Sequence, residues 1–425
     1  MRHELEVVIE TIGARGDGIA RWQGQGPLYV PYTLPGDRVR VRLGEPRAQG
    51  QAARVVALLT PGEGRAFPAC RHFGSCGGCA LQHLDAAHYQ AWKLELLAAS
   101  LARQKIALPE VRPLFLTPPA SRRRAEFAAV RRKRDLVLGF NARLSHQVIP
   151  LAECPVLRPT IAALLAPLNE LLAALLEPGA NADCMVTESD SGLDLLITTD
   201  TVLGLKRRER LADFARSNDL ARIARRHPKA RGSELLIERR PVRALFAGIA
   251  VALPPGAFLQ PTAEGEAILR RSVEEAVGGA SSVADLYAGC GTFGLPLAAA
   301  GLKVLAFERE KDLVEALLRA ARASAGQLRL AAEARDLERR PLDAAELKGC
   351  DAAVLDPPRA GAKAQAAALA ASRLARIALV SCNPATFARD ARLLLDGGYR
   401  LDWIQPVDQF LWSPHLELVA SFRRH

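Results

Sequence analysis

The sequence predicts an α/β protein with three parts: a doubly wound, Rossmann-like parallel sheet at the C-terminal end, a small N-terminal β-barrel and a central α+β region. Three observations lead to this division. Short strand-like runs separated by turns fill residues 1–59, basic runs and a group of cysteines mark residues 60–255, and strands alternate with helices over residues 256–425. Hydrophobic residues make up 49% of the 425 residues, which is enough to form several cores.

The N-terminal region has the pattern of a barrel built from short strands. Residues 4–9, 27–30 and 39–43 are rich in strand-forming side chains, and Gly-Asp-Gly and Pro-Gly-Asp turns separate them. OB-type barrels of this kind often bind RNA, and an unrelated small β-domain is the alternative. The Pro-Gly-Glu-Gly stretch at residues 61–64 then predicts a linker.

The central region combines helical and strand-like stretches with most of the clustered positive charge. Helical periodicity covers residues 86–104 and 161–176, and strand-like runs cover 136–140, 193–198 and 234–238. The formal net charge is +11, and basic runs stand at 122–124, 131–134, 206–208 and 225–226. These runs suit a surface that follows RNA phosphates, with an ordinary solvated face as the alternative. The chain shows neither a membrane-spanning run nor a secretion signal, so we expect a cytoplasmic protein without a membrane partner.

The C-terminal region predicts buried parallel strands at residues 282–287, 303–308, 351–356 and 376–382, with helices between them at 312–323 and 363–371. Ligands of such sheets bind at the carboxyl ends of the strands. Tyr287, Glu308, Asp356 and Cys382 each stand at one of these four ends. The sequence therefore predicts that these four side chains share one site.

A nucleotide-type pocket is predicted beside the first of these strands. Gly289, Gly291 and Gly294 form a GxGxxG pattern, and Glu308 at the next strand end can accept hydrogen bonds from ribose hydroxyls. These two features fit NAD and S-adenosyl-L-methionine equally well. The Asp-Pro-Pro-Arg sequence at 356–359 favours a methyltransferase, and the arginine makes methylation of an exocyclic amine less suitable because an aromatic residue usually follows the prolines there.

Cys382 is the candidate nucleophile. It ends a buried strand and precedes a turn that opens a helix, where the helix N-terminus is expected to lower the pKa of the thiol. Carbon 5 of uracil becomes nucleophilic when a thiolate adds to carbon 6, and the carbon 5 proton must then be removed. Glu417, on a short strand near the C-terminus, is the candidate base, with an ordinary exposed strand residue as the alternative.

Three of the eight cysteines crowd into ten residues and predict a metal site. Cys70, Cys76 and Cys79 supply three thiol ligands, and Cys154, in a Cys-Pro context, is the best fourth. A 4Fe-4S cluster is favoured over zinc, which usually takes two CxxC pairs. Because methyl transfer needs no redox step, the cluster would have a structural role.

Together these motifs resemble the bacterial 5-methyluridine RNA methyltransferases, above all the branch that acts on 23S ribosomal RNA. The resemblance covers almost the whole chain and implies a TRAM domain in residues 1–59, a 4Fe-4S cluster on the four cysteines, Cys382 in Ser-Cys-Asn-Pro-Ala-Thr as nucleophile and Glu417 as base. It implies that the cofactor S-adenosyl-L-methionine contacts Gln260, Tyr287, Thr292, Glu308, Asp336 and Asp356. Two departures concern this site: Thr292 replaces a common Asn, and Pro-Thr at 261–262 replaces a common Val-Asn.

Three other functions fit part of the sequence. The same chemistry on transfer RNA is the first, and the barrel favours the ribosomal branch over it. A non-catalytic RNA-binding assembly factor is the second, and the pair of Cys382 and Glu417 argues against it. An NAD-dependent or iron–sulfur redox enzyme is the third, and it leaves the barrel and the basic runs unexplained. A monomer is favoured.

Overall fold

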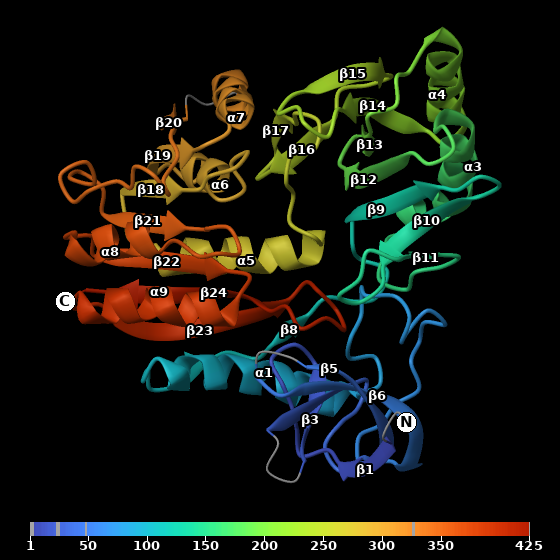
Figure 1. Ribbon diagram of the computed structural model, residues 1–425. Helices are drawn as coiled ribbons and strands as arrows, with labels where there is room; N and C mark the ends of the chain where they lie inside the picture. Colours follow the sequence, from blue (N-terminus) through green and yellow to red (C-terminus); the bar gives the residue numbers. More distant parts are fainter. Residues whose placement is uncertain (1–3, 23–25, 47–48, 325–327, 425) are drawn as a thin grey trace.

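The computed structural model describes residues 4–22, 26–46, 49–324 and 328–424. Figure 1 shows a curled N-terminal sheet, a central sheet and a large C-terminal sheet that follow one another along the chain, with a small two-stranded sheet before the last of them. The α/β fold class that the sequence predicts is confirmed. Each predicted strand or helix named above is present within a few residues of its expected ends.

The N-terminal sheet has six strands in the order β1-β5-β6-β4-β3-β2. Alternate side chains of β5 point inward, so that Val39 and Val41 are buried while Arg38 and Arg40 remain exposed. The strands of this sheet are β1 (Glu4–Val8), β2 (Thr11–Ile12), β3 (Asp17–Arg21), β4 (Pro27–Pro31), β5 (Arg38–Pro46) and β6 (Gln51–Thr60).

The central sheet has seven strands in the order β11-β10-β9-β12-β13-β14-β15, and helices α2, α3 and α4 accompany it. The predicted helix at 161–176 is divided at Leu164, because Pro167 has no N–H to bond the carbonyl of Ala163. The elements are β9 (Arg124–Arg131), β10 (Leu136–Asn141), β11 (Val148–Pro150), α2 (Pro159–Ala163), α3 (Leu165–Leu175), β12 (Asn181–Ser189), β13 (Gly192–Thr198), α4 (Leu205–Ser217), β14 (Leu220–Arg226) and β15 (Ser233–Glu238), followed by the hairpin of β16 (Arg243–Phe246) and β17 (Ile249–Ala252).

The C-terminal sheet runs β20-β19-β18-β21-β22-β24-β23-β7, and β8 also pairs with β23. Strands β18 to β22 are parallel, whereas β24 is antiparallel to both of its neighbours. Its elements are α5 (Ala263–Ala276), β18 (Ser282–Leu286), α6 (Gly294–Ala299), β19 (Lys303–Glu308), α7 (Lys311–Ala323), β20 (Leu330–Ala334), β21 (Ala352–Leu355), α8 (Lys363–Ala371), β22 (Arg376–Ser381), α9 (Pro384–Asp396), β23 (Arg400–Asp408) and β24 (Glu417–Arg423).

Part of the region between residues 60 and 255 belongs to the C-terminal sheet. Helix α1 (Ala86–Arg103) packs against α9, while β7 (Glu110–Val111) and β8 (Phe115–Leu116) extend the sheet beyond β23. Leu97 and Leu101 of α1 lie in the core shared with the sheet. The predicted boundary near residue 255 therefore does not coincide with the edge of the C-terminal sheet, since residues before it join that sheet. The assignment of a separate function to each of the three parts remains a prediction. Among the described residues, no helix is both long and apolar enough to span a bilayer.

Candidate active site

One edge of the C-terminal sheet gathers the predicted strand-end residues. Glu308 is the last residue of β19, and Tyr287, Asp356 and Cys382 each directly follow β18, β21 or β22. Because these strands are parallel, all four ends lie at the same edge. Glu417 joins them there because β24 runs in the opposite direction and begins at this edge.

Cys382, which directly follows β22, lies near Glu417, the first residue of the neighbouring strand β24. Ser381 of β22 pairs with Leu418 of β24, and Cys382 and Glu417 are the residues next to this pair on the two antiparallel strands. Glu417 is only 4% exposed, and Cys382 is half-buried. Burial and the nearby charge of Asp356 raise the pKa of Glu417 well above its usual range. A buried carboxyl group of this kind retains a proton readily, as a base that receives one must.

The expectation that the Cys382 thiol has a lowered pKa is wrong for the unliganded protein. The residue does precede α9, whose N-cap is Asn383. Burial, and next the charges of Glu417 and Asp356, nevertheless raise the pKa of the thiol to about 12, and Arg359 offsets only part of this rise. The desolvation of the anion and its two acidic neighbours outweigh the helix terminus.

A second buried carboxyl group lies within β18. Asp285 is fully buried, and neither of its oxygens has a partner with full hydrogen-bond geometry among the described residues, although the N–H of Gly294 faces one of them. Burial, followed by the charge of Asp356, raises the pKa of Asp285 to about 7. Burial likewise raises the pKa of Asp356 to about 7. Near neutral pH, protons are therefore distributed over several acidic groups at this edge.

The glycine-rich loop after β18 is held against Glu308. The carboxylate of Glu308 accepts hydrogen bonds from the backbone N–H of Gly289 at 3.0 Å and of Glu310 at 2.9 Å. Gly291 has a φ of 97°, and a β-carbon there would stand 2.6 Å from a methyl carbon of Leu317. The loop therefore needs glycine at this position both for its conformation and for its packing.

Tyr287 and Asp336 both contact Glu338. The hydroxyl of Tyr287 donates to Glu338 at 2.9 Å, and the carboxylate of Asp336 accepts from the backbone N–H of Glu338 at 3.1 Å. Asp336 thus fixes a turn that follows β20. Thr292 is half-buried in the turn before α6, at the end of the glycine loop. The cofactor contacts of these three residues remain predictions.

Gln260 is held by a hydrogen bond from Gln409. Its side-chain oxygen accepts a hydrogen bond from the amide of Gln409 at 2.9 Å, and both side chains are buried. Thr262, in the Pro-Thr pair that departs from the family, caps α5 through the N–H of Gly265 at 3.1 Å. Its hydroxyl also donates to the oxygen of Gln409 at 3.3 Å. Thr262 therefore supports Gln260 indirectly, through Gln409.

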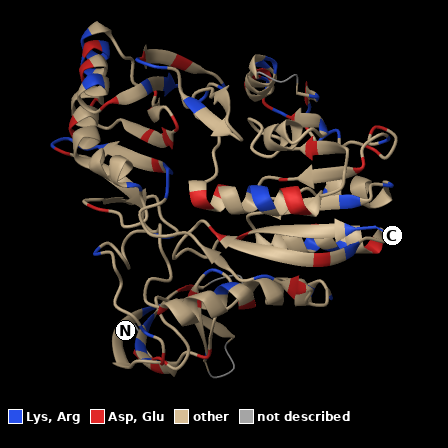
Figure 2. Cartoon of the chain, turned by 180° about the vertical axis from the view of Figure 1, so that it is seen from behind, with Lys and Arg blue, Asp and Glu red and all other residues tan. Residues whose placement is uncertain are grey.

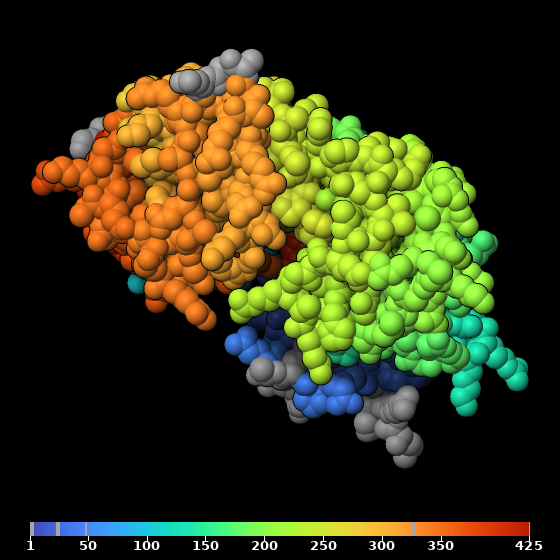
Figure 3. Space-filling view, turned by 90° about the horizontal axis from the view of Figure 1, so that it is seen from above, coloured from blue at the N-terminus to red at the C-terminus, as the bar shows by residue number. Residues whose placement is uncertain are grey.

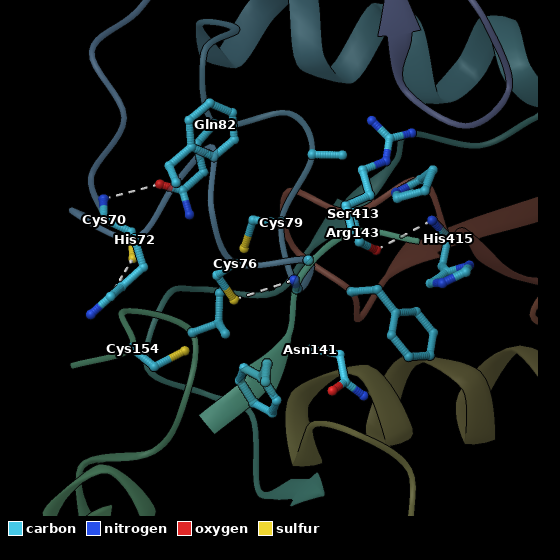
Figure 4. Close-up of a pocket in the computed structure, with 18 of the residues that line it drawn as sticks. Cys70, His72, Cys76, Cys79, Gln82, Asn141, Arg143, Cys154, Ser413 and His415 are labelled. Carbon is cyan, nitrogen blue, oxygen red and sulfur yellow. Dashed lines mark hydrogen bonds between the residues drawn. The ribbon is translucent and has the colours of Figure 1, made fainter. Parts of the chain in front are cut away.

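The four predicted cluster cysteines line one cavity of about 750 Å³. Cys70, Cys76, Cys79 and Cys154 are all free thiols, and Figure 4 shows their sulfur atoms around the same space. Burial raises the pKa of Cys79 to about 12, and the other three cysteines add to this rise. As the side chains lie, no set of three acidic, histidine or cysteine groups within the described ranges is arranged to hold a metal ion. The number and type of the thiols fit a site with four cysteine ligands, and its occupation remains a prediction.

The cavity of the cysteines reaches the edge of the sheet that carries Cys382. Arg359 and His415 line it together with the cysteines, as does Phe410, which contacts the His415 ring edge-to-face at 5.5 Å. Burial lowers the pKa of His415 to about 4, so its ring is neutral at pH 7. Figure 3 shows a hollow between the orange C-terminal surface and the yellow-green central surface, with red C-terminal residues at its bottom.

Comparison with known proteins identifies the family. A model of tRNA (Uracil-5-)-methyltransferases matches residues 248–424, and a TRAM domain model matches residues 2–55. A 23S rRNA (uracil(1939)-C(5))-methyltransferase of Halomonas elongata is 34% identical, over 97% of this chain and 88% of its own length. The chain belongs to the RNA uracil-5-methyltransferase family. The resemblance inferred from the motifs is confirmed.

Other members of this family are also similar over their whole length. An RNA methyltransferase of Caulobacter vibrioides, named as uncharacterized, is 43% identical over 99% of this chain and 100% of its own. Among solved structures, the Pyrococcus abyssi tRNA (uracil-54, C5)-methyltransferase in complex with S-adenosyl-L-homocysteine superposes with a TM-score of 0.74. The two sequences are 24% identical, and the superposition covers 98% of this chain and 99% of the Pyrococcus abyssi chain. This likeness shows that the two chains share a fold.

Sequence reasoning missed three residues at this site. Asp285, a carboxylate inside an apolar strand, was detectable from the sequence because such a residue is rarely buried without a role. Gln409 and Lys93 had no such signal. Gln409 contacts the site through Gln260, which is 149 positions away in the chain. Lys93 contacts it through His415, which is 322 positions away.

Proposed function

We propose that this chain methylates carbon 5 of a uridine in RNA with S-adenosyl-L-methionine as methyl donor. The observation that carries the proposal is the proximity of Cys382 and Glu417 at the edge of the sheet where ligands of such folds bind. One residue is a nucleophile by type, and the other is a buried carboxyl group suited to hold a proton. Membership of the uracil-5-methyltransferase family supports the same reaction.

In the proposed reaction the two residues act in sequence. The Cys382 thiol loses its proton to solvent, and the resulting thiolate adds to carbon 6 of the uracil, which moves electron density to carbon 5. Carbon 5 then takes the electrophilic methyl group that S-adenosyl-L-methionine supplies. Glu417 removes the proton from carbon 5, the carbon 5–carbon 6 double bond forms again, and the thiolate leaves. The raised pKa of Glu417 favours this proton transfer.

The proposed donor site consists of the residues around the glycine loop. Glu308 already accepts two backbone hydrogen bonds, and its position at the end of β19 is the one from which a carboxylate meets ribose hydroxyls. Gln260, Tyr287, Thr292, Asp336 and Asp356 complete the proposed set. Asp356 lies near Cys382, since its charge adds to burial in raising the pKa of the thiol.

We propose 23S ribosomal RNA as the substrate and the cytoplasm as the place of action. The 34% identity with an enzyme named for uracil 1939 of 23S rRNA supports this substrate, and the TRAM domain supports binding of RNA. Part of the basic surface is neutralised: Figure 2 shows both charges along α4, where Arg208 pairs with Glu234 at 2.6 Å. The phosphate-binding cations are therefore expected among the arginines that have no such partner.

The cysteine cavity is proposed to hold a 4Fe-4S cluster. Cys70, Cys76, Cys79 and Cys154 are its proposed ligands, and zinc is the competing metal. The cluster would fix the loop of residues 70–82 against the catalytic edge of the sheet. Ala80 and Leu81 of this loop already donate backbone hydrogen bonds to the carbonyl of Trp412.

Mapping 5-methyluridine by mass spectrometry in RNA from cells with and without the gene tests the function. We expect one 5-methyluridine in 23S rRNA to disappear and to return with the wild-type chain but not with Cys382→Ala. Loss of a 5-methyluridine in transfer RNA instead would retain the chemistry and overturn the substrate. Unchanged 5-methyluridine in both RNAs would contradict the proposed reaction.

A further inference from the structure

A lysine is among the largest fully buried side chains in the described part of the protein. Lys93 of α1 has 0% exposure, and its ammonium group lies 3.0 Å from a carboxylate oxygen of Asp408, which is also 0% exposed. Burial lowers the pKa of Lys93, and the charge of Asp408 opposes that change. A fully desolvated ion pair is a poor source of stability, because apolar residues of similar volume often serve as well or better. The burial of the Lys93–Asp408 pair therefore requires an explanation other than stability.

The ammonium group of Lys93 has a second partner close to the proposed base. It donates a hydrogen bond to the carbonyl oxygen of His415, two residues before Glu417. Asp408 ends β23 and Glu417 begins β24, so residues 409–416 form the connection between them, which we name the junction loop. The ammonium group of Lys93 therefore binds both Asp408, which precedes the junction loop, and the carbonyl of His415, near the end of the loop.

The junction loop is held at several points by side chains from other elements. Gln409 donates to Gln260 on the donor side at 2.9 Å. The N–H of Trp412 donates to the hydroxyl of Tyr89 at 2.8 Å, and this hydroxyl bonds Asp408 in turn. Trp412 itself has a φ of 60°, a conformation that a non-glycine residue keeps only when its surroundings hold it there. The loop is therefore a constrained element and not a flexible connection.

We propose that Lys93 is a positioning residue for the proton-transfer step. Through Asp408 and the carbonyl of His415, it fixes the junction loop and with it the carboxyl group of Glu417 relative to the uracil bound at Cys382. This inference rests on the proposed function, because it assumes that Glu417 removes the carbon 5 proton. Misplacement of a catalytic group by about 1 Å can slow a step by about a hundredfold.

The test follows the covalent complex between protein and RNA in single turnover. The substrate is a transcript that contains the uridine identified by mapping, and the holoenzyme is purified without oxygen. For Lys93→Met we expect the denaturation-stable complex to form at a rate close to that of the wild type and to decay about tenfold more slowly or worse. Glu417→Gln is the positive control for persistence of the complex.

A matched variant separates positioning from stability. Lys93→Met leaves Asp408 buried without its cation, so the chain is expected to lose thermal stability. The double variant Lys93→Met/Asp408→Asn removes both charges and should regain much of the unfolding temperature, yet its complex should still decay slowly. Arg222→Met, which breaks the buried pair with Asp194 in the central sheet, should lower the unfolding temperature without prolonging the complex.

The outcomes distinguish the two proposals. A wild-type chain that methylates RNA without passing through a Cys382 complex would overturn the proposed mechanism itself. A wild-type complex that forms, together with a double variant whose complex decays at the wild-type rate, would overturn the role of Lys93 alone. If Lys93→Met does not fold, the double variant and Tyr89→Phe, which removes only one hydroxyl from the network, decide the question.

Discussion

Cys382 directly follows β22 and lies near Glu417, the first residue of β24, and the charge of Glu417 adds to burial in raising the pKa of the thiol. Because two like charges oppose each other in a buried site, the thiolate is favoured only when Glu417 carries a proton. The nucleophile and the base are therefore coupled. After the addition, Glu417 must release that proton before it can accept the one on carbon 5.

Replacement of the nucleophile should stop the reaction without emptying the donor site. We expect Cys382→Ala to reduce methyl transfer to background, while the affinity for S-adenosyl-L-methionine, measured by calorimetry, changes by less than about threefold. Cys350→Ser is a suitable control because this half-buried thiol precedes β21 at the opposite edge of the sheet. Turnover by Cys382→Ala would exclude covalent catalysis at this residue.

Replacement of the base should trap the covalent complex. In Glu417→Gln the proton on carbon 5 has no acceptor, so a complex with RNA that survives denaturation should accumulate on a gel. Glutamine is neutral, as Glu417 is when it carries a proton, so the complex should form at least as fast as in the wild type. Slow turnover without any accumulated complex would assign the base to another residue.

The rate of thiol addition should rise with pH. With the pKa of Cys382 near 12, the thiolate fraction increases about tenfold for each pH unit between 7 and 9. We expect the rate of complex formation by the wild type in single turnover to follow this increase until another step limits it. A rate that is flat from pH 7 to 9 would mean that bound RNA or donor lowers the pKa of the thiol below 7.

Asp285 should make the unliganded protein less stable as the pH rises. Its pKa is raised from 3.8 to about 7, so its ionised form is disfavoured in the folded state. Stability is therefore lost between about pH 4 and pH 7, by at most about 4 kcal/mol, and stays low above that range. Asp285→Asn should unfold at a higher temperature than the wild type at pH 8, and the difference should vanish near pH 4.

A carboxylate with the opposite shift provides the control for this measurement. Hydrogen bonds from Ser281 and Ser282 lower the pKa of Asp351, which lies at the other end of the sheet. Its contribution is present above pH 4 and is lost as the pH falls through its folded pKa. Asp351→Asn should therefore reduce the unfolding temperature at pH 8. A gain in stability from both variants would contradict the opposite signs of the two pKa shifts.

Iron content should depend on the cavity cysteines alone. Anaerobic preparations of the wild type should contain iron and sulfide, and Cys79→Ser should lose most of both, while Cys184→Ala, in the core of the central sheet, should keep them. Loss of the cluster should also loosen the junction loop, because Ala80 and Leu81 bond Trp412. Stoichiometric zinc in place of iron would overturn the assignment of the metal.

Local sequence patterns were sufficient for most of the elements that the sequence analysis names. The strands that end at Tyr287, Glu308, Asp356 and Cys382 were predicted because apolar runs and turn residues are properties of neighbouring positions. The split of the helix at 161–176 was missed, although Pro167 carried the signal. The assignment of residues 86–116 to the central region could not anticipate that α1, β7 and β8 complete the C-terminal sheet, since such pairing is a long-range choice.

The sequence by itself determined which residue types stand at the catalytic edge, because strand periodicity and direction bring the strand ends together. Only the tertiary structure decided the protonation of those residues and what holds them. The raised pKa of Cys382 depends on burial and on Glu417, and the junction loop depends on an ion pair between residues 93 and 408, which are 315 positions apart. Desolvation and long-range contacts exist only after the chain has folded, and no local pattern encodes them.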